Sequence, residues 1–232
     1  MALHFVSAII VAAGNSTRMG MEKIFLPLNA VPSIVYTLKA FECAESIDEV
    51  ILVCRDEHAS TLREIIKKYK VKKVTKFAPG GRFRQESAFS GINICGTRTT
   101  HYAVHDAARC LITSAEIDSV VRDAFLHRAS SLGVPCKDTI KSVDSQNFVV
   151  KSLDRSVLWN IQTPQVFAKE LYLAAMDAAV RTCADYTDDC QLIENIGERV
   201  HIVRGSYSNL KLTTPDDITV FEGILRQRSV SI

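Results

Sequence analysis

Short apolar runs alternate with amphipathic stretches through the first part of the chain. Aliphatic and β-branched residues fill most of segments 5–12 and 50–54, and they are interleaved with three lysines in segment 71–77. Continuous apolar runs of this length predict strands that are buried on both faces. Between and after them, apolar residues recur at helical spacing, and the predicted helices are residues 32–41, 57–69 and 85–94. This order is typical of βαβ units, so we expect an α/β fold with a mostly parallel sheet covered by helices.

The same alternation continues through the second part of the chain, with one interruption. A helix is expected near Ser114 as N-cap, with Glu116 in its first turn. Residues 137–155 break the pattern, because alternating polar and apolar residues flank a polar turn at 144–147, which predicts a projecting β-hairpin. The other expected elements are strands at 101–105, 131–135 and 199–203 and helices at 169–182, 188–196 and 215–227.

Composition narrows the class of protein. The chain has 232 residues, 47% hydrophobic and 23% charged, and we expect one compact domain over residues 1–232. Lysine and arginine number 28 against 26 acidic residues, so no overall basic field favours nucleic acid. The apolar opening at 6–13 is too short to span a membrane and lacks a basic leader, and it predicts a buried strand in a cytoplasmic protein. The seven cysteines show no Cys-x-x-Cys spacing, and we expect reduced thiols that mostly fill the core.

The loop after the first strand carries candidate chemistry. Residues 11–20 follow a predicted strand, and ligands of open parallel sheets bind at the carboxyl ends of strands. Small residues let backbone N–H groups approach a phosphate chain, and cations add donors to it. The loop matches neither a P-loop nor a dinucleotide-binding glycine motif, and a plain turn with surface cations is the alternative. The candidate residues are Ala12, Ala13, Gly14, Arg18 and Lys23.

Further polar segments follow predicted strands or lie in loops. Asp106 and Arg109 follow the strand at 101–105, where the alternative to a ligand site is a structural ion pair. His101 and His105 lie on that strand, and we expect both to be packing residues rather than metal ligands. The remaining segments are 79–87, 135–141, 154–159, 162–167, 187–189 and 205–217.

In order and spacing, these segments resemble the 2-C-methyl-D-erythritol 4-phosphate cytidylyltransferase family. The likeness runs from about residue 7 to 221 and includes Ala-Ala-Gly, Arg-Met-Gly and a lysine before residues 25–28. It implies a Rossmann-like nucleotidyltransferase fold and a homodimer formed through an arm at about 136–157. It also implies transfer of a cytidylyl group from CTP to 2-C-methyl-D-erythritol 4-phosphate, with Mg²⁺ carried by CTP and pyrophosphate released. Compared with the family, the interval between Arg18 and Lys23 is short, and Cys110 stands where proline is usual.

The resemblance also assigns roles to residues. Arg18, Lys23 and Lys211 are the expected catalytic cations. No protein residue is expected to form a dedicated metal site. The expected CTP-binding residues are Ala12, Ala13, Gly14, Arg18, Lys23, Gly81, Arg84, Ser87, Asp106 and Ala107. The expected polyol-phosphate residues are Asp106, Arg109, Thr139, Arg155, Thr163, Thr187 and Lys211.

Each assignment has a structural alternative. The glycines at 80–81 could form a turn before a helix cap, and Thr187 could cap the helix that follows it. The charged hairpin could be a solvated edge protected against aggregation. At the level of function, the alternatives are a ribitol 5-phosphate cytidylyltransferase and, more distantly, a non-catalytic nucleotide-binding protein. Segments 104–109 and 187–189 favour the methylerythritol enzyme.

The chemistry implied by the resemblance needs no side-chain base. A phosphate monoester has a second pKa of about 6 and is largely dianionic at neutral pH. The obstacle is repulsion between two polyanions and the charge that accumulates on the α-phosphate and the departing pyrophosphate. Cations and backbone donors that are held in position are therefore expected to provide the catalysis.

Overall fold

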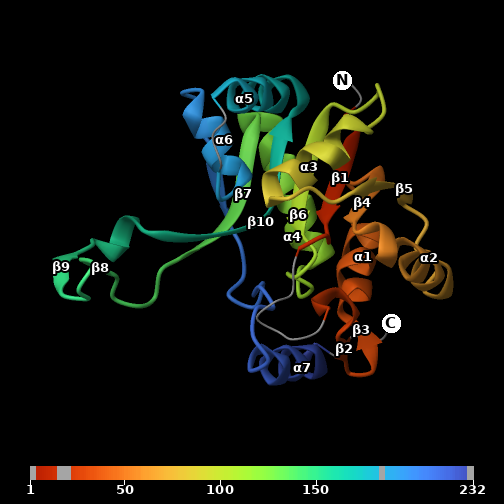
Figure 1. Ribbon diagram of the computed structural model, residues 1–232, viewed down its shortest axis with the longest axis horizontal. Coiled ribbons are helices and arrows are strands. Elements are labelled where there is room, and N and C mark those ends of the chain that lie inside the picture. Colours follow the sequence, from red (N-terminus) through yellow and green to blue (C-terminus); the bar gives the residue numbers. More distant parts are fainter. Residues whose placement is uncertain (1–3, 15–21, 183–185, 229–232) are drawn as a thin grey trace.

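The fold is built on one mixed sheet (Figure 1). The computed structural model describes residues 4–14, 22–182 and 186–228. Within these residues, seven strands form a sheet in the order β11-β7-β10-β6-β1-β4-β5. The strands are β1 (Val6–Val11), β4 (Glu49–Cys54), β5 (Val74–Pro79), β6 (His101–Asp106), β7 (Ala129–Pro135), β10 (Trp159–Ala168) and β11 (His201–Arg204).

Strand direction follows the predicted βαβ pattern, with one exception. β1 pairs in parallel with β4 and β6, β4 with β5, and β7 with β11. β10 runs antiparallel to both β6 and β7. The sequence analysis predicted no strand here, because Pro164 and the polar residues around it lack the alternation of a strand. The register of β10 against β7 shifts between Ile161 and Gln165, which accommodates this irregular stretch.

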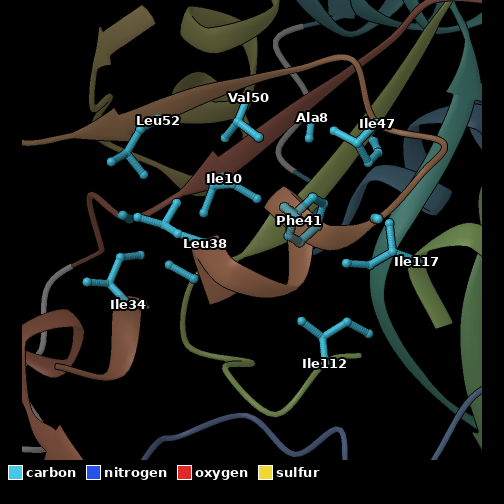
Figure 2. Packing of buried hydrophobic residues seen from close by; sticks show 14 of the residues in the cluster. Ala8, Ile10, Ile34, Leu38, Phe41, Ile47, Val50, Leu52, Ile112 and Ile117 are labelled. Carbon is cyan, nitrogen blue, oxygen red and sulfur yellow. The ribbon is translucent and has the colours of Figure 1, made fainter. Parts of the chain in front are cut away.

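Helices cover both faces of the sheet. Even-numbered residues of β1, such as Ala8 and Ile10, point into a core formed with α1, α2 and α4. Figure 2 shows Ile10 close to Leu38 and Phe41 of α1 within this cluster. Odd-numbered residues such as Ile9 meet α3, α5 and α6 on the other face. The helices are α1 (Ser33–Cys43), α2 (Ala59–Lys68), α3 (Arg84–Asn93), α4 (Ser114–His127), α5 (Lys169–Thr182) and α6 (Asp189–Asn195). The predicted α/β class is therefore confirmed.

A smaller apolar cluster lies beside the sheet. The helix α7 (Asp217–Gln227) packs through Phe221 and Leu225 against a short hairpin, β2 (Pro27–Leu28) and β3 (Val31–Pro32). Figure 1 shows α7 and this hairpin at the end of the molecule away from α5 and α6. The cluster anchors the C-terminal segment below the carboxyl ends of β1 and β6.

The predicted hairpin projects from the body as an arm (Figure 1). Its strands are β8 (Lys141–Val143) and β9 (Val149–Ser152), which pair antiparallel. The turn between them is closed by Asp144, whose side chain accepts hydrogen bonds from the backbone N–H groups of Gln146 and Phe148. The arm leaves β7 and returns to β10, so its base is fixed by the sheet.

Three details differ from the sequence expectations. The N-cap of α4 is Thr113 rather than Ser114, and Thr113 forms a reciprocal capping box with Glu116. The cap of α6 is Asp188, not Thr187. Six cysteines lie in the described residues and are free thiols, of which three, Cys54, Cys110 and Cys190, are buried, so core filling accounts for half of them.

No helix in the described ranges combines the length and apolar character needed to cross a membrane.

Candidate active site

A pocket of about 410 Å³ opens at the carboxyl ends of β1 and β6. This is the edge of the sheet at which the sequence placed the site. The predicted site residues that line it come from four separated segments of the chain. They are Ala12, Ala13, Gly14, Lys23, Gly81, Arg84, Ser87, Asp106 and Lys211.

Backbone hydrogen bonds hold the first loop in place. The N–H of Ala12 donates to the carbonyl of Val53 at 2.8 Å, and the N–H of Ala107 donates to the carbonyl of Val11 at 3.0 Å. The next loop approaches so closely that a Cβ atom on Gly80 would lie 2.3 Å from the Cβ of Ala13. Only glycine at position 80 lets these two loops form one wall.

The loop before α3 is folded tightly around its own helix start. The N–H of Gly81 donates to Ser87 Oγ at 2.9 Å, and the N–H of Arg82 donates to Glu86 Oε2 at 2.7 Å. A Cβ on Gly81 would come within 2.3 Å of the Cβ of Glu86. The glycine turn therefore has a structural role as well as a place in the pocket wall.

A chain of alternating charges crosses the pocket. Lys211 Nζ donates to Asp106 Oδ2 at 2.7 Å, and Arg84 Nε donates to Asp106 Oδ1 at 2.8 Å. Arg84 Nη1 also donates to Asp189 Oδ2 at 2.6 Å, and Asp189 Oδ1 accepts from the Tyr172 hydroxyl at 2.6 Å. Each carboxylate thus holds a cation at a fixed position before any ligand arrives.

Burial and charge act in opposite directions on these groups. Burial alone would raise the pKa of the Asp106 carboxyl, but the charges and hydrogen bonds of Arg84 and Lys211 bring the pKa far below its ordinary value. Burial would lower the pKa of Arg84, yet Asp189 and Asp106 raise it well above the usual value. Burial and the charge of Asp189 raise the pKa of the Tyr172 hydroxyl. Asp106 and Arg84 are therefore ionised at neutral pH, and Tyr172 is a neutral donor.

Arg109 lies behind the pocket wall, where it joins three segments. Its Nη1 donates to the carbonyl of Asn209 at 2.9 Å, and its Nη2 donates to the carbonyl of Ile161 at 3.3 Å. Its Nε is buried and has no hydrogen-bond partner among the described residues. Burial lowers the pKa of this guanidinium, and Arg84 adds to the effect.

Thr163 connects β10 to the end of β6. Its hydroxyl accepts from the N–H of Asp106 at 3.1 Å and shares a hydrogen bond with His105 Nδ1 at 3.0 Å. His105 is fully buried against Phe41, and burial lowers its pKa to about 3. His101 is also buried, beside Phe125. Both histidines pack as the sequence indicated.

The other predicted residues lie outside the pocket lining. Ala107 is buried beneath it, and its carbonyl accepts from the Thr37 hydroxyl. The hydroxyl of Thr187 donates to the Gln191 side chain. Thr139 and Arg155 are exposed on the arm, where Arg155 Nη1 donates to the carbonyl of Lys137 at 2.9 Å. Arg18 lies outside the described residues.

Sequence reasoning missed several residues of the site. Arg82, Phe83 and Ala108 line the pocket, although no role was predicted for them. Asp189 was seen only as part of segment 187–189. Its partner Arg84 lies 105 residues earlier in the chain, and a pairing over that distance leaves no local signal.

Comparison with known proteins identifies the family. The family model of 2-C-methyl-D-erythritol 4-phosphate cytidylyltransferase matches residues 6–227. The chain belongs to this family. A relative of that name from Caldanaerobacter subterraneus subsp. tengcongensis is 42% identical over 96% of this chain and 99% of its own length. A chloroplastic relative of the same name from Oryza sativa subsp. japonica is 37% identical over 96% of this chain and 75% of its own.

Solved structures agree with this cytidylyltransferase assignment. A 4-diphosphocytidyl-2C-methyl-D-erythritol synthase from Anaerococcus prevotii superposes with a TM-score of 0.87 at 29% identity, covering 96% of each chain. The 2-C-methyl-D-erythritol 4-phosphate cytidylyltransferase of Thermus thermophilus gives 0.79 at 26% identity, covering 96% of this chain and 99% of its own. The chain, with its sheet and projecting arm, therefore has the fold of the cytidylyltransferases.

Proposed function

We propose that this chain carries out the reaction of its family in the pocket at the ends of β1 and β6. CTP transfers its cytidylyl group to 2-C-methyl-D-erythritol 4-phosphate, which gives 4-diphosphocytidyl-2-C-methyl-D-erythritol, an isoprenoid precursor, and pyrophosphate. The observation that supports this location is the convergence of Lys23, Arg84 and Lys211 around one pocket from distant parts of the chain. Such a cluster suits two anionic ligands that repel each other.

The pocket residues fit a reaction that depends on positioning. The attacking phosphate monoester is largely dianionic at neutral pH and needs no base. Lys23, together with Arg18, would face the triphosphate, where backbone N–H groups of the first loop add donors. Lys211 would contact the substrate phosphate while Asp106 holds it in place. Because Asp106 and Asp189 hold Lys211 and Arg84 in place beforehand, these two cations would stabilise the charge of the transition state without reorganisation.

Mg²⁺ fits this pocket as an ion that enters with CTP. Asp106 is the one carboxylate among the described residues that line it, and both its oxygens already bind cations. Mg²⁺ would therefore take most of its ligands from the triphosphate and water, and Asp106 is the residue that could help to hold it. When bound, the ion neutralises triphosphate charge and orients the leaving pyrophosphate.

The arm supports a homodimer. Phe148 and Val150 are each 68% exposed, and Val157 is 73% exposed. A group of large apolar side chains on a thin hairpin is typical of a surface that another chain covers. We propose that a second copy covers it and that Thr139 and Arg155 then reach the polyol phosphate in the partner's pocket.

The same proposal includes the single domain and the cytoplasmic location that the sequence analysis expected. Residues 1–232 would act as one catalytic domain, since the family match covers nearly all of them. The free state of the six described cysteines is compatible with a reducing compartment such as the cytoplasm.

Measuring pyrophosphate release with purified full-length chain tests the proposal. We expect turnover with CTP and 2-C-methyl-D-erythritol 4-phosphate, none above background with ribitol 5-phosphate, and loss of turnover when EDTA removes divalent ions. Turnover with ribitol phosphate alone would reject the substrate. CTP binding without pyrophosphate release from either polyol would reject the catalytic function.

The dimer has a separate test. Val150→Asp places a charge on the exposed face of the arm and should shift the chain from dimer to monomer in sedimentation velocity, with unchanged melting of the body. Lys151→Ala at the neighbouring position is the matched control. A wild-type monomer at micromolar concentration would contradict the dimer and leave the reaction itself untouched.

A further inference from the structure

Two histidines and an aspartate converge at the edge of the sheet opposite the pocket. Asp123 and His127 lie one turn apart on α4, and His201 is the first residue of β11. His201 pairs with Ser130 near the start of β7. The pocket, by contrast, lies where β1 and β6 end. The cluster is therefore separate from the catalytic site.

We propose that Asp123, His127 and His201 bind one Zn²⁺ ion. Each residue offers one ligand atom, and the three atoms lie within 4.8 Å of one another. His201 Nδ1 lies 2.7 Å from Asp123 Oδ2, and His127 Nε2 lies 3.9 Å from Asp123 Oδ1. Ligands about 2.1 Å from a tetrahedral zinc ion are about 3.4 Å apart. Small side-chain movements therefore suffice to bring all three onto one ion.

The ligand set selects the kind of ion. Two imidazoles and one carboxylate suit zinc and its neighbours in the first transition row, whereas Mg²⁺ prefers oxygen ligands alone. Three protein ligands leave a fourth position open to water. This separates the site chemically from the Mg²⁺ that accompanies CTP.

The surroundings already orient the ligands. Ser130 Oγ donates to Asp123 Oδ2 at 2.6 Å, which fixes the carboxylate as partners behind a metal ligand commonly do. The rings of His127 and His201 stack with centroids 4.1 Å apart. All three ligands are on regular elements rather than on loops.

The position of the site indicates its effect. β11 is the edge strand of the sheet, and α4 packs against β7, β10 and β11. An ion held between the last turn of α4 and the start of β11 would tie the edge strand to the body. We therefore expect bound zinc to stabilise the fold and leave the rate of pyrophosphate release unchanged.

Isothermal titration of tag-free full chain with Zn²⁺ tests the site. Wild type should bind one ion per chain, and a hundredfold excess over the dissociation constant should raise the melting temperature by about 5 °C. His201→Gln and His127→Gln should each weaken binding at least tenfold and abolish the shift. His4→Gln is the matched control, because His4 stacks on Phe125 of the same helix but offers no ligand to the cluster.

Three results would overturn the proposal. One is the absence of zinc binding by wild type. Another is equal binding by wild type and both glutamine variants, which would place the ion elsewhere, for example on the exposed thiol of Cys43. A third is anomalous scattering at the zinc edge that locates the ion away from α4 and β11. Because His127 and His201 are about half exposed, the variants should fold, and circular dichroism without zinc confirms it.

Discussion

The pocket and the arm both carry arginines that the family resemblance assigns to ligands, but their surroundings differ. Arg84 is held between Asp106 and Asp189, with distances of 2.8 and 2.6 Å. Arg155 is exposed on the arm and donates to the carbonyl of Lys137. Phe41 in the body is likewise fully buried, whereas Phe148 on the arm is mostly exposed.

The difference separates the residues of the proposed site that one chain holds in place from those that it leaves exposed. The pocket brings its own counter-charges, so its cations are positioned whether or not a ligand is present. The arm has neither a packed core nor ion pairs of comparable burial. This exposed hairpin is compatible with the proposal that the arm serves a neighbouring subunit.

The largest expected effect is on the stability of the pocket. Arg84→Met would leave the buried carboxylate of Asp189 without its cation, and breaking a buried pair in this way costs about 3–5 kcal/mol. Urea unfolding should show this loss. Arg82→Met, two positions away on the exposed side of the loop, should change stability by less than about 0.5 kcal/mol. Equal stability of the two variants would show that the charge chain does not hold the pocket together.

The next effect is on turnover. Lys23→Ala should lower kcat by about 10²-fold, because it removes a cation from the side of the pocket proposed to hold the triphosphate. Arg18→Ala should act similarly. Lys67→Ala, on the exposed surface of α2, is the control and should keep the wild-type rate. Normal kcat in both pocket variants would contradict the catalytic role of this wall.

Much of the body could be predicted from the sequence, because the patterns that indicate its strands and helices are local. Apolar periodicity located β1, β4 and β6 and the helices that cover them, and the glycine loops located the pocket edge. β10 was missed, since Pro164 and its polar neighbours conceal a strand that exists through pairing with β6 and β7. Asp189 was missed because its role depends on Arg84. Family likeness, rather than local pattern, pointed to Arg155, and the isolated chain leaves that assignment as a prediction.

A third prediction concerns acidic pH, which should lower the stability of the buried body and have no such effect on the arm. Burial lowers the pKa of His105 to about 3, and burial together with His4 lowers that of His101 to about 4. In the unfolded chain both titrate near 6.5. The unfolded state therefore binds more protons between these values, so stability is complete above about pH 6.5 and falls as the pH decreases. The expected slope is about 1.4 kcal/mol per pH unit for each histidine.

Urea unfolding between pH 4.5 and 7 measures the contribution of these two histidines to the pH dependence of stability. Asp106 has a depressed pKa, so its contribution is present throughout this range and is lost only below it. In His105→Gln the slope should decrease by about 1.4 kcal/mol per pH unit. A slope identical to wild type would mean that His105 is not buried in its neutral form.

The smallest expected effect is on substrate affinity through the arm. Arg155→Ala should raise the KM for 2-C-methyl-D-erythritol 4-phosphate about 10-fold, the loss of one charged hydrogen bond, and change the KM for CTP less than twofold. Lys151→Ala on the same arm is the control and should leave both constants unchanged. Steady-state kinetics at saturating concentration of the other substrate measures each constant. Equal increases in both KM values would mean that Arg155 supports the whole pocket, and would reject the proposed contrast between a nucleotide site within one chain and a polyol site shared by two.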